Sequence, residues 1–505
     1  MTAITRRNLV ASTAVAGAVA ALAGAGVSRM GIAHAEEAAS EPDKTVDCDI
    51  AVVGAGASGL CAAVQAAQLG ANVVCLESQS ASGGNINGVE GCFGIGSSMQ
   101  KEQGIEIDPG ATIRSELAAS QCRASGLGYV DMVHASGENI DWLVENGVTF
   151  GGVDCDKGDI MVFHRFASGT GAADFTQPMT AKAEELGVTF MYETAATSLV
   201  KSDEGAVTGV LAEGPDGTVQ VNAKAVIVAT GGFAQNDELM AGVALNKHVT
   251  YGGFPGHDGS GHLMCVDAGA RSYRDRAAML VAFDIEGTPG YYSGGLFAFV
   301  FGVSAPYAVW VNQNGERFIN EDCAATNPML MCMPHLEQQE SYAVIDSAML
   351  ATYAGDNLDT ALEQIEGGIE FGSIYKADTI EELAEATGLS GLTSTIEEYN
   401  GFVEEGSDSN YGKDPSALVA VAEAPFYALR VSSGLNSTIG SIYTDRSFHA
   451  LDDDMNPIEG LYVVGVEGAM LWSNLYTINV SGGCNANNVN SGRVAAQDAC
   501  KGLGL

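Results

Sequence analysis

Four residues in the first part of the chain have types and a spacing suited to binding a diphosphate and the ribose attached to it. Gly54, Gly56 and Gly59 form a Gly-x-Gly-x-x-Gly pattern, and Glu77 follows further along. The first glycine of such a pattern permits a tight turn, the second lets the backbone approach a diphosphate, and the third lets a helix pack closely on a strand. A carboxylate at the position of Glu77 accepts hydrogen bonds from the hydroxyl groups of a ribose.

A β-α-β unit is needed to position these residues. The apolar run 49–53 predicts a buried parallel strand, 60–69 a helix that ends at Gly70, and 71–76 a second strand. The N-terminus of the helix would direct free N–H groups and the positive end of its dipole at the phosphates. Because a carboxylate at the ribose would repel a 2′-phosphate, the unit predicts FAD or NAD rather than NADP.

Further motifs follow in order along the chain. The loop 78–85 contains Gly83, Gly84 and Asn85, and the other motifs are 164–171 (beginning His-Arg-Phe), 224–233, 258–264, 311–321, 460–468 and 491–496. Together they resemble the flavoprotein subunits of fumarate reductases and succinate dehydrogenases, a family that includes soluble flavocytochromes, urocanate reductases and ketosteroid dehydrogenases. The resemblance spans nearly all of the chain and selects FAD over NAD.

The resemblance implies an α/β fold in which a doubly wound, Rossmann-like FAD-binding domain is interrupted by an α+β capping domain. We expect the FAD-binding domain at 46–274 and 436–505 and the cap at 275–435, with the flavin between them. We expect FAD to be bound noncovalently, since no histidine is placed for a covalent link, and we predict no metal site. The motifs assign FAD binding to Gly54, Gly56, Ala57, Ser58, Gly59, Glu77, Ser82, Gly83, Gly84, Asn85, Ala196, Thr230, Gly231, Gly259, Ser260, Glu467, Gly482, Cys484 and Asn485.

The chain departs from the family pattern where fumarate reductases bind and protonate their substrate. The family's proton-donating arginine corresponds to Ala325, its substrate histidine to Ser437, and its second substrate arginine to Asn479 or a neighbour. A site for two carboxylates needs fixed cations to offset desolvation of the charges. Fumarate and urocanate are therefore not the expected substrates.

Aromatic residues are frequent in the same regions, at 291–307 and 471–481. Such side chains suit a flat, weakly charged molecule, although aromatic residues in a cap also commonly form its core. Reduction of a conjugated C=C bond needs a proton donor and a group that stabilises the enolate. We predict Tyr476 as the proton donor, with Tyr307 as the second candidate, and backbone N–H groups near Gly482 and Gly483 as the enolate-stabilising group. For His164 and Arg165 we favour a structural or cofactor role.

The composition limits the partners. A formal net charge of −40 argues against nucleic acid and against an anionic membrane surface, and it would attract a basic protein. The 11 cysteines are scattered, so most are expected to be buried free thiols. Residues 1–35 carry Arg6 and Arg7, an apolar run from 10 to 27 and a small-residue Ala-His-Ala end, which predict a twin-arginine signal peptide and export to the periplasm or cell envelope. No later stretch predicts stable membrane insertion.

Three functions are compatible with these residues. The leading hypothesis is an exported FAD-dependent oxidoreductase that reduces a C=C bond conjugated to a carbonyl in an aromatic or steroid-like acceptor. Its electrons would come from a separate cytochrome or quinol-linked donor, because the chain contains no haem, iron–sulfur or second nucleotide motif. The alternatives are an FAD-dependent dehydrogenase that forms a C=C bond and a non-catalytic flavin electron carrier.

Overall fold

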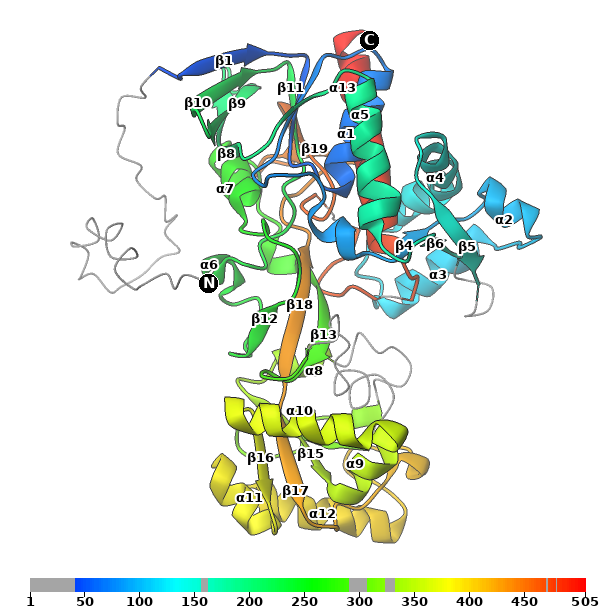
Figure 1. The fold of residues 1–505 in the computed structure, drawn as a ribbon, viewed down its shortest axis with the longest axis vertical. Helices are drawn as coiled ribbons and strands as arrows, with labels where there is room; N and C mark the ends of the chain where they lie inside the picture. Colours follow the sequence, from blue (N-terminus) through cyan, green and yellow to red (C-terminus); the bar gives the residue numbers. More distant parts are fainter. Residues whose placement is uncertain (1–40, 156–161, 290–306, 323–331, 469–470, 478) are drawn as a thin grey trace, which may run out of the picture. The chain divides into compact units, whose positions relative to one another are not determined.

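A computed structural model describes residues 41–155, 162–289, 307–322, 332–468, 471–477 and 479–505. The chain divides into two units, Met1–Glu41 and Pro42–Leu505. Every helix and strand described below belongs to the second unit (Figure 1).

A six-stranded sheet contains the predicted nucleotide-binding strands. Its order is β19-β20-β11-β2-β3-β7, and all neighbours pair in parallel except β19 and β20. The strands are β2 (Ile50–Val53), β3 (Val73–Leu76), β7 (Thr189–Met191), β11 (Ala225–Val228), β19 (His449–Leu451) and β20 (Pro457–Val463). The strand that returns late in the sequence therefore pairs next to the N-terminal β-α-β unit.

Both faces of this sheet are buried, as its continuous apolar strands require. Because side chains alternate along a strand, Ile50 and Val52 face one core while Ala51 and Val53 face another. The first core contains α1 (Ala57–Gln68), α5 (Gln177–Glu185) and α13 (Gly483–Leu503), which lie together in Figure 1. The second contains α7 (Ser260–Asp267) and a four-stranded sheet, β1-β10-β9-β8, formed by β1 (Lys44–Asp47), β8 (Ala195–Lys201), β9 (Val207–Gly214) and β10 (Gly217–Asn222).

The part of the predicted FAD-binding domain between β3 and α5 in the sequence forms a smaller lobe. It contains a three-stranded sheet with the order β4-β6-β5 and three helices. Its elements are β4 (Gly91–Phe93), α2 (Ser98–Glu102), α3 (Pro109–Ala119), α4 (Gly126–Glu145), β5 (Phe150–Asp154) and β6 (Phe163–Phe166), flanked by the short helices η1 (Gly84–Gly88) and η2 (Ala172–Thr176).

A second three-stranded sheet, β12-β18-β13, connects the two predicted domains; we call it the linker sheet. It consists of β12 (Val249–Tyr251), β13 (Ala278–Asp284) and β18 (Ser432–Ile439), near α6 (Asp237–Met240) and η3 (Arg274–Arg276) in the sequence. The linker sheet crosses both predicted boundaries of the cap, because β12 precedes residue 275 and β18 runs through residues 435 and 436.

The cap has its own sheet and its own hydrophobic core. The sheet order is β14-β15-β17-β16, and all neighbours are antiparallel. The strands are β14 (Val309–Asn312), β15 (Ser341–Asp346), β16 (Ile374–Ala377) and β17 (Phe426–Arg430). The helices are α8 (Met333–Leu336), α9 (Ser347–Ala354), α10 (Leu358–Phe371), α11 (Ile380–Thr387) and α12 (Leu392–Glu405), with the short helices η8 (Gly355–Asn357) and η9 (Pro415–Ala417).

The predicted α/β fold class is confirmed by these sheets. The helix of the β-α-β unit begins at Ala57, three residues before the predicted Leu60, because Gly56 is its N-cap and the glycine pattern extends into its first turn. The ten described cysteines are free thiols, and most of them are buried, as expected.

Candidate functional site

The N-terminus of α1 is built around the three glycines. Gly54 has φ = +102°, and a Cβ there would lie 2.5 Å from the Ala229 oxygen. A Cβ at Gly59 would lie 1.9 Å from the Gly54 oxygen, so this helix turn can approach β2 only with glycine. Gly56 caps α1 without any side chain, and a Cβ there would meet only the Gly83 oxygen, at 3.4 Å. Ala57 and Ser58 form the buried first turn, which leaves an uncapped helix end suited to an anion.

Glu77 lies directly beside this helix end. Its two carboxylate oxygens accept hydrogen bonds from the N–H groups of Ala55 and Gln79, each at 2.8 Å. Thr194 N also donates to the Glu77 backbone oxygen at 2.9 Å. Ala196, two residues beyond Thr194 on β8, is thereby brought near the same end of β3. This arrangement is compatible with a ribose at Glu77 and an adenine beside Ala196.

The second Gly-rich loop packs on the first. Gly83 N donates to the Ala55 oxygen at 3.0 Å, and a Cβ at Gly84 would meet no atom within 4 Å. The Ser82 hydroxyl is 2.9 Å from the Tyr192 hydroxyl. The side chain of Asn85 instead reaches the linker sheet.

Asn85 connects this loop to two other segments. Its Nδ2 donates to the Asn436 oxygen of β18 at 2.8 Å. Its Oδ1 accepts from Phe254 N at 2.7 Å and from the Tyr251 hydroxyl at 3.3 Å. Asn85 therefore anchors the loop through its side chain, and only its backbone and its second amide hydrogen are left for a ligand.

A buried acid lies where the last nucleotide-binding strand ends. Glu467 is fully buried, and its Oε2 accepts a hydrogen bond from the Thr230 hydroxyl at 2.5 Å. Burial raises the pKa of Glu467 to about 8, so the carboxyl group is protonated at neutral pH. Its Oε1 is buried with no hydrogen-bond partner among the described residues. Such an atom indicates a missing partner, because buried polar groups are normally hydrogen-bonded.

The Gly259–Gly261 turn closes around this acid. Gly259 has φ = +76° and caps α7, and Ser260 N donates to Asp258 Oδ1 at 2.9 Å. A Cβ at Gly261 would lie 2.0 Å from the Thr230 hydroxyl and 2.4 Å from Glu467 Oε1. The structure thus brings Thr230, Gly231, Gly259, Ser260 and Glu467 together, although they come from three separate parts of the sequence.

His257 was not singled out in the sequence, and it lies against the same turn. Its Nδ1 accepts from Gly232 N at 3.2 Å, and a Cβ at Gly231 would lie 3.1 Å from its ring. Burial lowers the pKa of His257 to about 4, so the ring is neutral. In the sequence, the feature that could have indicated a role for His257 is its position between Gly256 and the Asp258-Gly259 pair.

The N-terminus of α13 holds the remaining predicted residues. Gly482, with φ = +74°, is the N-cap, and its oxygen accepts from Phe93 N at 3.2 Å. Asn485 Nδ2 donates to the Gly91 oxygen at 3.2 Å, while its Oδ1 is buried without a described partner. Cys484 N donates to the Tyr476 hydroxyl oxygen at 3.1 Å. Gly483 N donates to the Val480 oxygen, so this N–H already has an acceptor within the turn.

Tyr476 belongs to the hydrophobic core that contains α13, whereas Tyr307 lies in the cap. Tyr476 is 7% exposed and packs edge-on against Trp472, with ring centroids 4.9 Å apart. Tyr307 stacks on Tyr353 of α9, with centroids 4.7 Å apart, and Tyr353 packs on the core of the cap. The geometry therefore favours Tyr476 as the residue near the α13 turn.

Three positions depart from the family pattern, and the two that the structure describes, Ser437 and Asn479, carry neutral side chains. The Ser437 hydroxyl donates to the Thr438 oxygen at 3.0 Å, and Asn479 Nδ2 lies 3.5 Å from the Ser115 oxygen. Ala325 and the aromatic run from 291 to 306 lie outside the described residues.

The His164-Arg165 pair has protein partners. His164 Nε2 is 2.7 Å from the buried Ser97 hydroxyl, and burial lowers the pKa of His164 to about 4. Arg165 is exposed and pairs with Asp154 at 2.5 Å. These contacts are those of structural residues.

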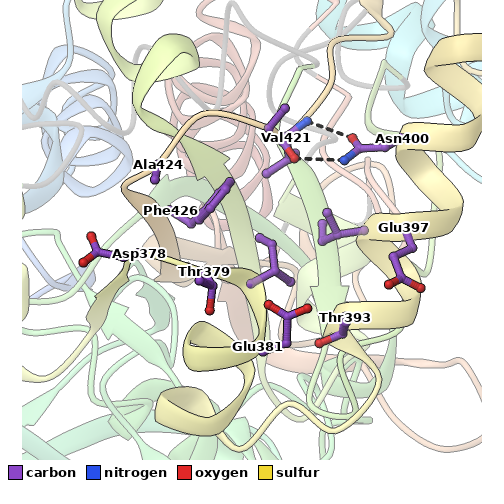
Figure 2. Close-up of a pocket in the computed structure, with 12 residues that line it drawn as sticks. Asp378, Thr379, Glu381, Thr393, Glu397, Asn400, Val421, Ala424 and Phe426 are labelled. Carbon is purple, nitrogen blue, oxygen red and sulfur yellow. Dashed lines mark hydrogen bonds between the residues drawn. The ribbon is translucent and has the colours of Figure 1, made fainter.

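A separate hollow of about 410 Å³ lies in the cap, between α11, α12 and β17 (Figure 2). The carboxylates of Asp378, Glu381 and Glu397 line it, and the Asn400 side chain exchanges two hydrogen bonds with the backbone of Val421. It contains none of the predicted site residues.

The described residues contain neither a membrane-spanning helix nor a cluster of metal-ligating side chains. No helix in this part of the chain is long and apolar enough to span a membrane. No cluster of His, Cys, Asp or Glu within the same residues could hold a metal ion.

The residues present fit FAD. An uncapped helix end with a glycine cradle suits the diphosphate, and Glu77 suits the ribose. The Glu467 oxygen that has no partner among the described residues points to a further polar contact.

Comparison with known proteins gives the same assignment. Residues 49–474 match the family model described as FAD binding domain. The chain is 30% identical to a vinyl phenol reductase of Lactiplantibacillus plantarum, over 89% of this chain and 96% of that protein.

Two solved structures are also similar. A flavocytochrome c3 fumarate reductase in its open conformation matches with 26% identity and a TM-score of 0.64, over 91% of this chain and 79% of the other. A 3-ketosteroid-Δ4-(5α)-dehydrogenase from Rhodococcus jostii matches with 25% identity and a TM-score of 0.65, over 90% and 97% of the two chains. The chain therefore belongs to the FAD-binding-domain family and is an FAD-dependent oxidoreductase of the class that acts on CH–CH groups.

Proposed function

We propose that this protein reduces a C=C bond conjugated to a carbonyl in an aromatic or steroid-like acceptor. The observation that supports it most directly is the Tyr476 hydroxyl, which lies at the first turn of α13 beside the predicted FAD-binding residues Gly482 and Cys484. When bound, reduced FAD supplies a hydride to one carbon of such a bond. The protein must then supply a proton for the other carbon.

Tyr476 is the side chain that we assign to this proton. Its oxygen accepts the N–H of Cys484, which places the hydroxyl at the first turn of α13. The N–H donor and the positive end of the α13 dipole would stabilise negative charge left on the phenol oxygen after the proton is given up.

The acceptor class follows from the charges around the site. Ser437 and Asn479 are neutral and cannot offset the charges of a dicarboxylate, and the Tyr476 ring beside the α13 turn packs on the buried ring of Trp472. The similarity to a vinyl phenol reductase supports an aromatic acceptor, and the similarity to a ketosteroid dehydrogenase supports a flat enone.

A separate redox protein would supply the electrons, and we propose a cytochrome or quinol-linked donor on the outer side of the cytoplasmic membrane. Arg6, Arg7 and the Ala33–Ala35 end of the N-terminal segment support export to the periplasm or cell envelope.

Anaerobic mixing tests the proposed function. The FAD-loaded protein is reduced with dithionite and mixed with cinnamate-type acids, steroid enones, fumarate and urocanate, while flavin absorbance is followed. We expect fast reoxidation by an aromatic acid or an enone, with formation of the saturated product, and slow reoxidation by the other two. Reoxidation by none of them would contradict the proposal and support a flavin electron carrier.

The second candidate is a dehydrogenase that introduces the C=C bond, favoured by the similarity to the ketosteroid dehydrogenase. Mixing the oxidised protein with saturated ketones and an artificial electron acceptor distinguishes the two directions. Rapid flavin reduction by a saturated ketone would support the dehydrogenase.

A further inference from the structure

Glu116 is a buried carboxylic acid that the proposed chemistry does not use directly. It lies on α3 and is 2% exposed. Its Oε2 accepts hydrogen bonds from the Tyr129 hydroxyl of α4 at 2.7 Å and from the Thr477 hydroxyl at 2.6 Å. Its Oε1 is buried and has no hydrogen-bond partner within the described ranges. One carboxylate oxygen thus joins three parts of the chain.

Two of the three parts, α4 with Tyr129 and the segment that contains Thr477, adjoin Tyr476 or the Trp472 ring on which it packs. Thr477 is the next residue in the chain, so the Glu116 hydrogen bond fixes the backbone immediately after the tyrosine. Tyr129 and Tyr476 both pack edge-on against Trp472, at 6.4 and 4.9 Å between ring centroids. Any movement of Tyr129 or Thr477 would therefore be transmitted to the Tyr476 ring, because these buried groups are closely packed.

Hydrogen bonds to other parts of the chain hold the segment 471–477, among them those from the Tyr273 hydroxyl to the Trp472 oxygen at 3.3 Å and from Asn474 N to the Arg276 oxygen at 2.8 Å. It contains no helix or strand, and its first residue is held by Ser125 N, which donates to the Leu471 oxygen at 3.0 Å. The Tyr476 hydroxyl is held by Cys484 N at the opposite side. The Glu116–Thr477 contact is a further attachment, at the last residue of this segment.

We propose that Glu116 is a positioning residue for Tyr476, which fixes the phenol hydroxyl at the first turn of α13 by holding Thr477 and Tyr129 on one oxygen. This proposal depends on the proposed function in one respect: the kinetic tests use the rate of the proposed reaction to report the position of Tyr476. Displacement of a reacting group by about 1 Å is enough to lower a rate about 100-fold.

Steady-state kinetics of the FAD-loaded full chain provide the first test. Glu116→Ala and Thr477→Val should each lower kcat by about 10- to 100-fold while KM changes less than about threefold. Thr477→Ser retains the hydroxyl and should keep a kcat close to that of the parent. Asp498→Ala is the matched control, because Asp498 also accepts a tyrosine hydroxyl, that of Tyr462 at 3.0 Å, but on the C-terminal part of α13. We expect this control to keep the parent kcat. An unchanged kcat in Thr477→Val would overturn the proposal even if Glu116→Ala failed to fold.

A double-mutant cycle separates positioning from a general loss of structure. If Glu116 acts through Tyr476, Glu116→Ala should lower the remaining rate of Tyr476→Phe by less than about twofold. An equal loss in both backgrounds would show that Glu116 acts independently of the tyrosine, and the proposal would be wrong.

A spectroscopic test needs no turnover. With 3-fluorotyrosine incorporated at position 476, the parent should give one narrow ¹⁹F resonance, and Thr477→Val should shift or broaden it while Asp498→Ala does not. An identical resonance in Thr477→Val would refute the positioning role. A shifted resonance in a protein that reduces no acceptor would retain that role and reject the proposed function.

Discussion

At the scale of single residues, Tyr476 determines whether the proposed chemistry is correct. Replacing it with phenylalanine removes only the hydroxyl and retains the ring that packs on Trp472. A general acid typically contributes 10²- to 10⁴-fold to a rate, so we expect kcat to fall at least about 100-fold with FAD still bound. Stopped-flow reoxidation measures the rate, and flavin absorbance measures the loading. A fully active phenylalanine variant would require a different proton donor.

Glu467 gives a prediction about cofactor binding at the same scale. Because burial raises its pKa to about 8, the acid resembles an amide at neutral pH, with one acceptor and one donor. We expect Glu467→Gln to keep FAD affinity within about threefold and Glu467→Ala to weaken it about tenfold or more, since the hydrogen bond to a buried partner is lost. Equilibrium dialysis of free FAD measures both. Equal affinities in the two variants would show that Oε1 makes no cofactor contact.

At the scale of elements, the glycine turn before α1 separates folding from ligand binding. A methyl group at Gly59 would collide with the Gly54 oxygen at 1.9 Å, whereas one at Gly56 would meet only the Gly83 oxygen at 3.4 Å. We therefore expect Gly59→Ala to lower the melting temperature of the apoprotein by several degrees. Gly56→Ala should leave that temperature nearly unchanged and weaken FAD binding. Thermal unfolding with and without FAD distinguishes the two effects, and a stable, FAD-binding Gly59→Ala variant would contradict this account of the turn.

The cap contains a histidine that should make its core sensitive to acid. His335 of α8 is fully buried between the rings of Trp310, Phe283 and Phe318, and burial lowers its pKa to about 3. The unfolded chain binds a proton at this residue below about pH 6.5, while the folded chain does not. The stabilisation is therefore complete above pH 6.5 and is lost as the pH falls toward 3, at about 1.4 kcal/mol per pH unit.

Denaturant unfolding of the parent and of His335→Asn measures this contribution between pH 7.5 and 5. As the pH is lowered, the free energy of unfolding should fall less steeply in the variant than in the parent. The difference in slope should approach about 1.4 kcal/mol per pH unit, the value for one proton. Parallel curves would show that His335 is already protonated in the folded cap.

The elements also show how much could be predicted from the sequence. The β-α-β unit could be predicted because its signals, apolar strands and turn glycines, are local, although the helix begins three residues earlier and the second strand two residues later than predicted. The contacts that build the site are not local. Glu116 and Thr477 are 361 residues apart and Asn85 and Asn436 are 351 apart, so no spacing or periodicity indicates that they meet. The same holds for Glu467 and the turn at Gly259.

At the scale of the whole molecule, the formal net charge of −40 should govern the encounter with an electron donor. A basic cytochrome would be attracted over several ångströms, and salt would screen that attraction. We expect the second-order rate of flavin reduction by a basic cytochrome to fall about tenfold or more between 10 and 200 mM salt. Reduction by a neutral dye should not change. A salt-independent rate with the basic cytochrome would show that the acidic surface does not guide the donor.

The Asn85 side chain has a consequence for assembly with the coenzyme. It joins the Gly83–Gly84 loop to the Asn436 backbone of β18 and to Phe254. If FAD orders that loop, thermodynamic reciprocity requires that coenzyme capture and the docking of β18 favour each other. Amide hydrogen exchange in 249–254 and 432–439 would then slow on coenzyme addition, although neither segment carries a nucleotide-binding motif. Through this one amide, holding the coenzyme would also rigidify the strand that leads from the cap back to the nucleotide-binding half.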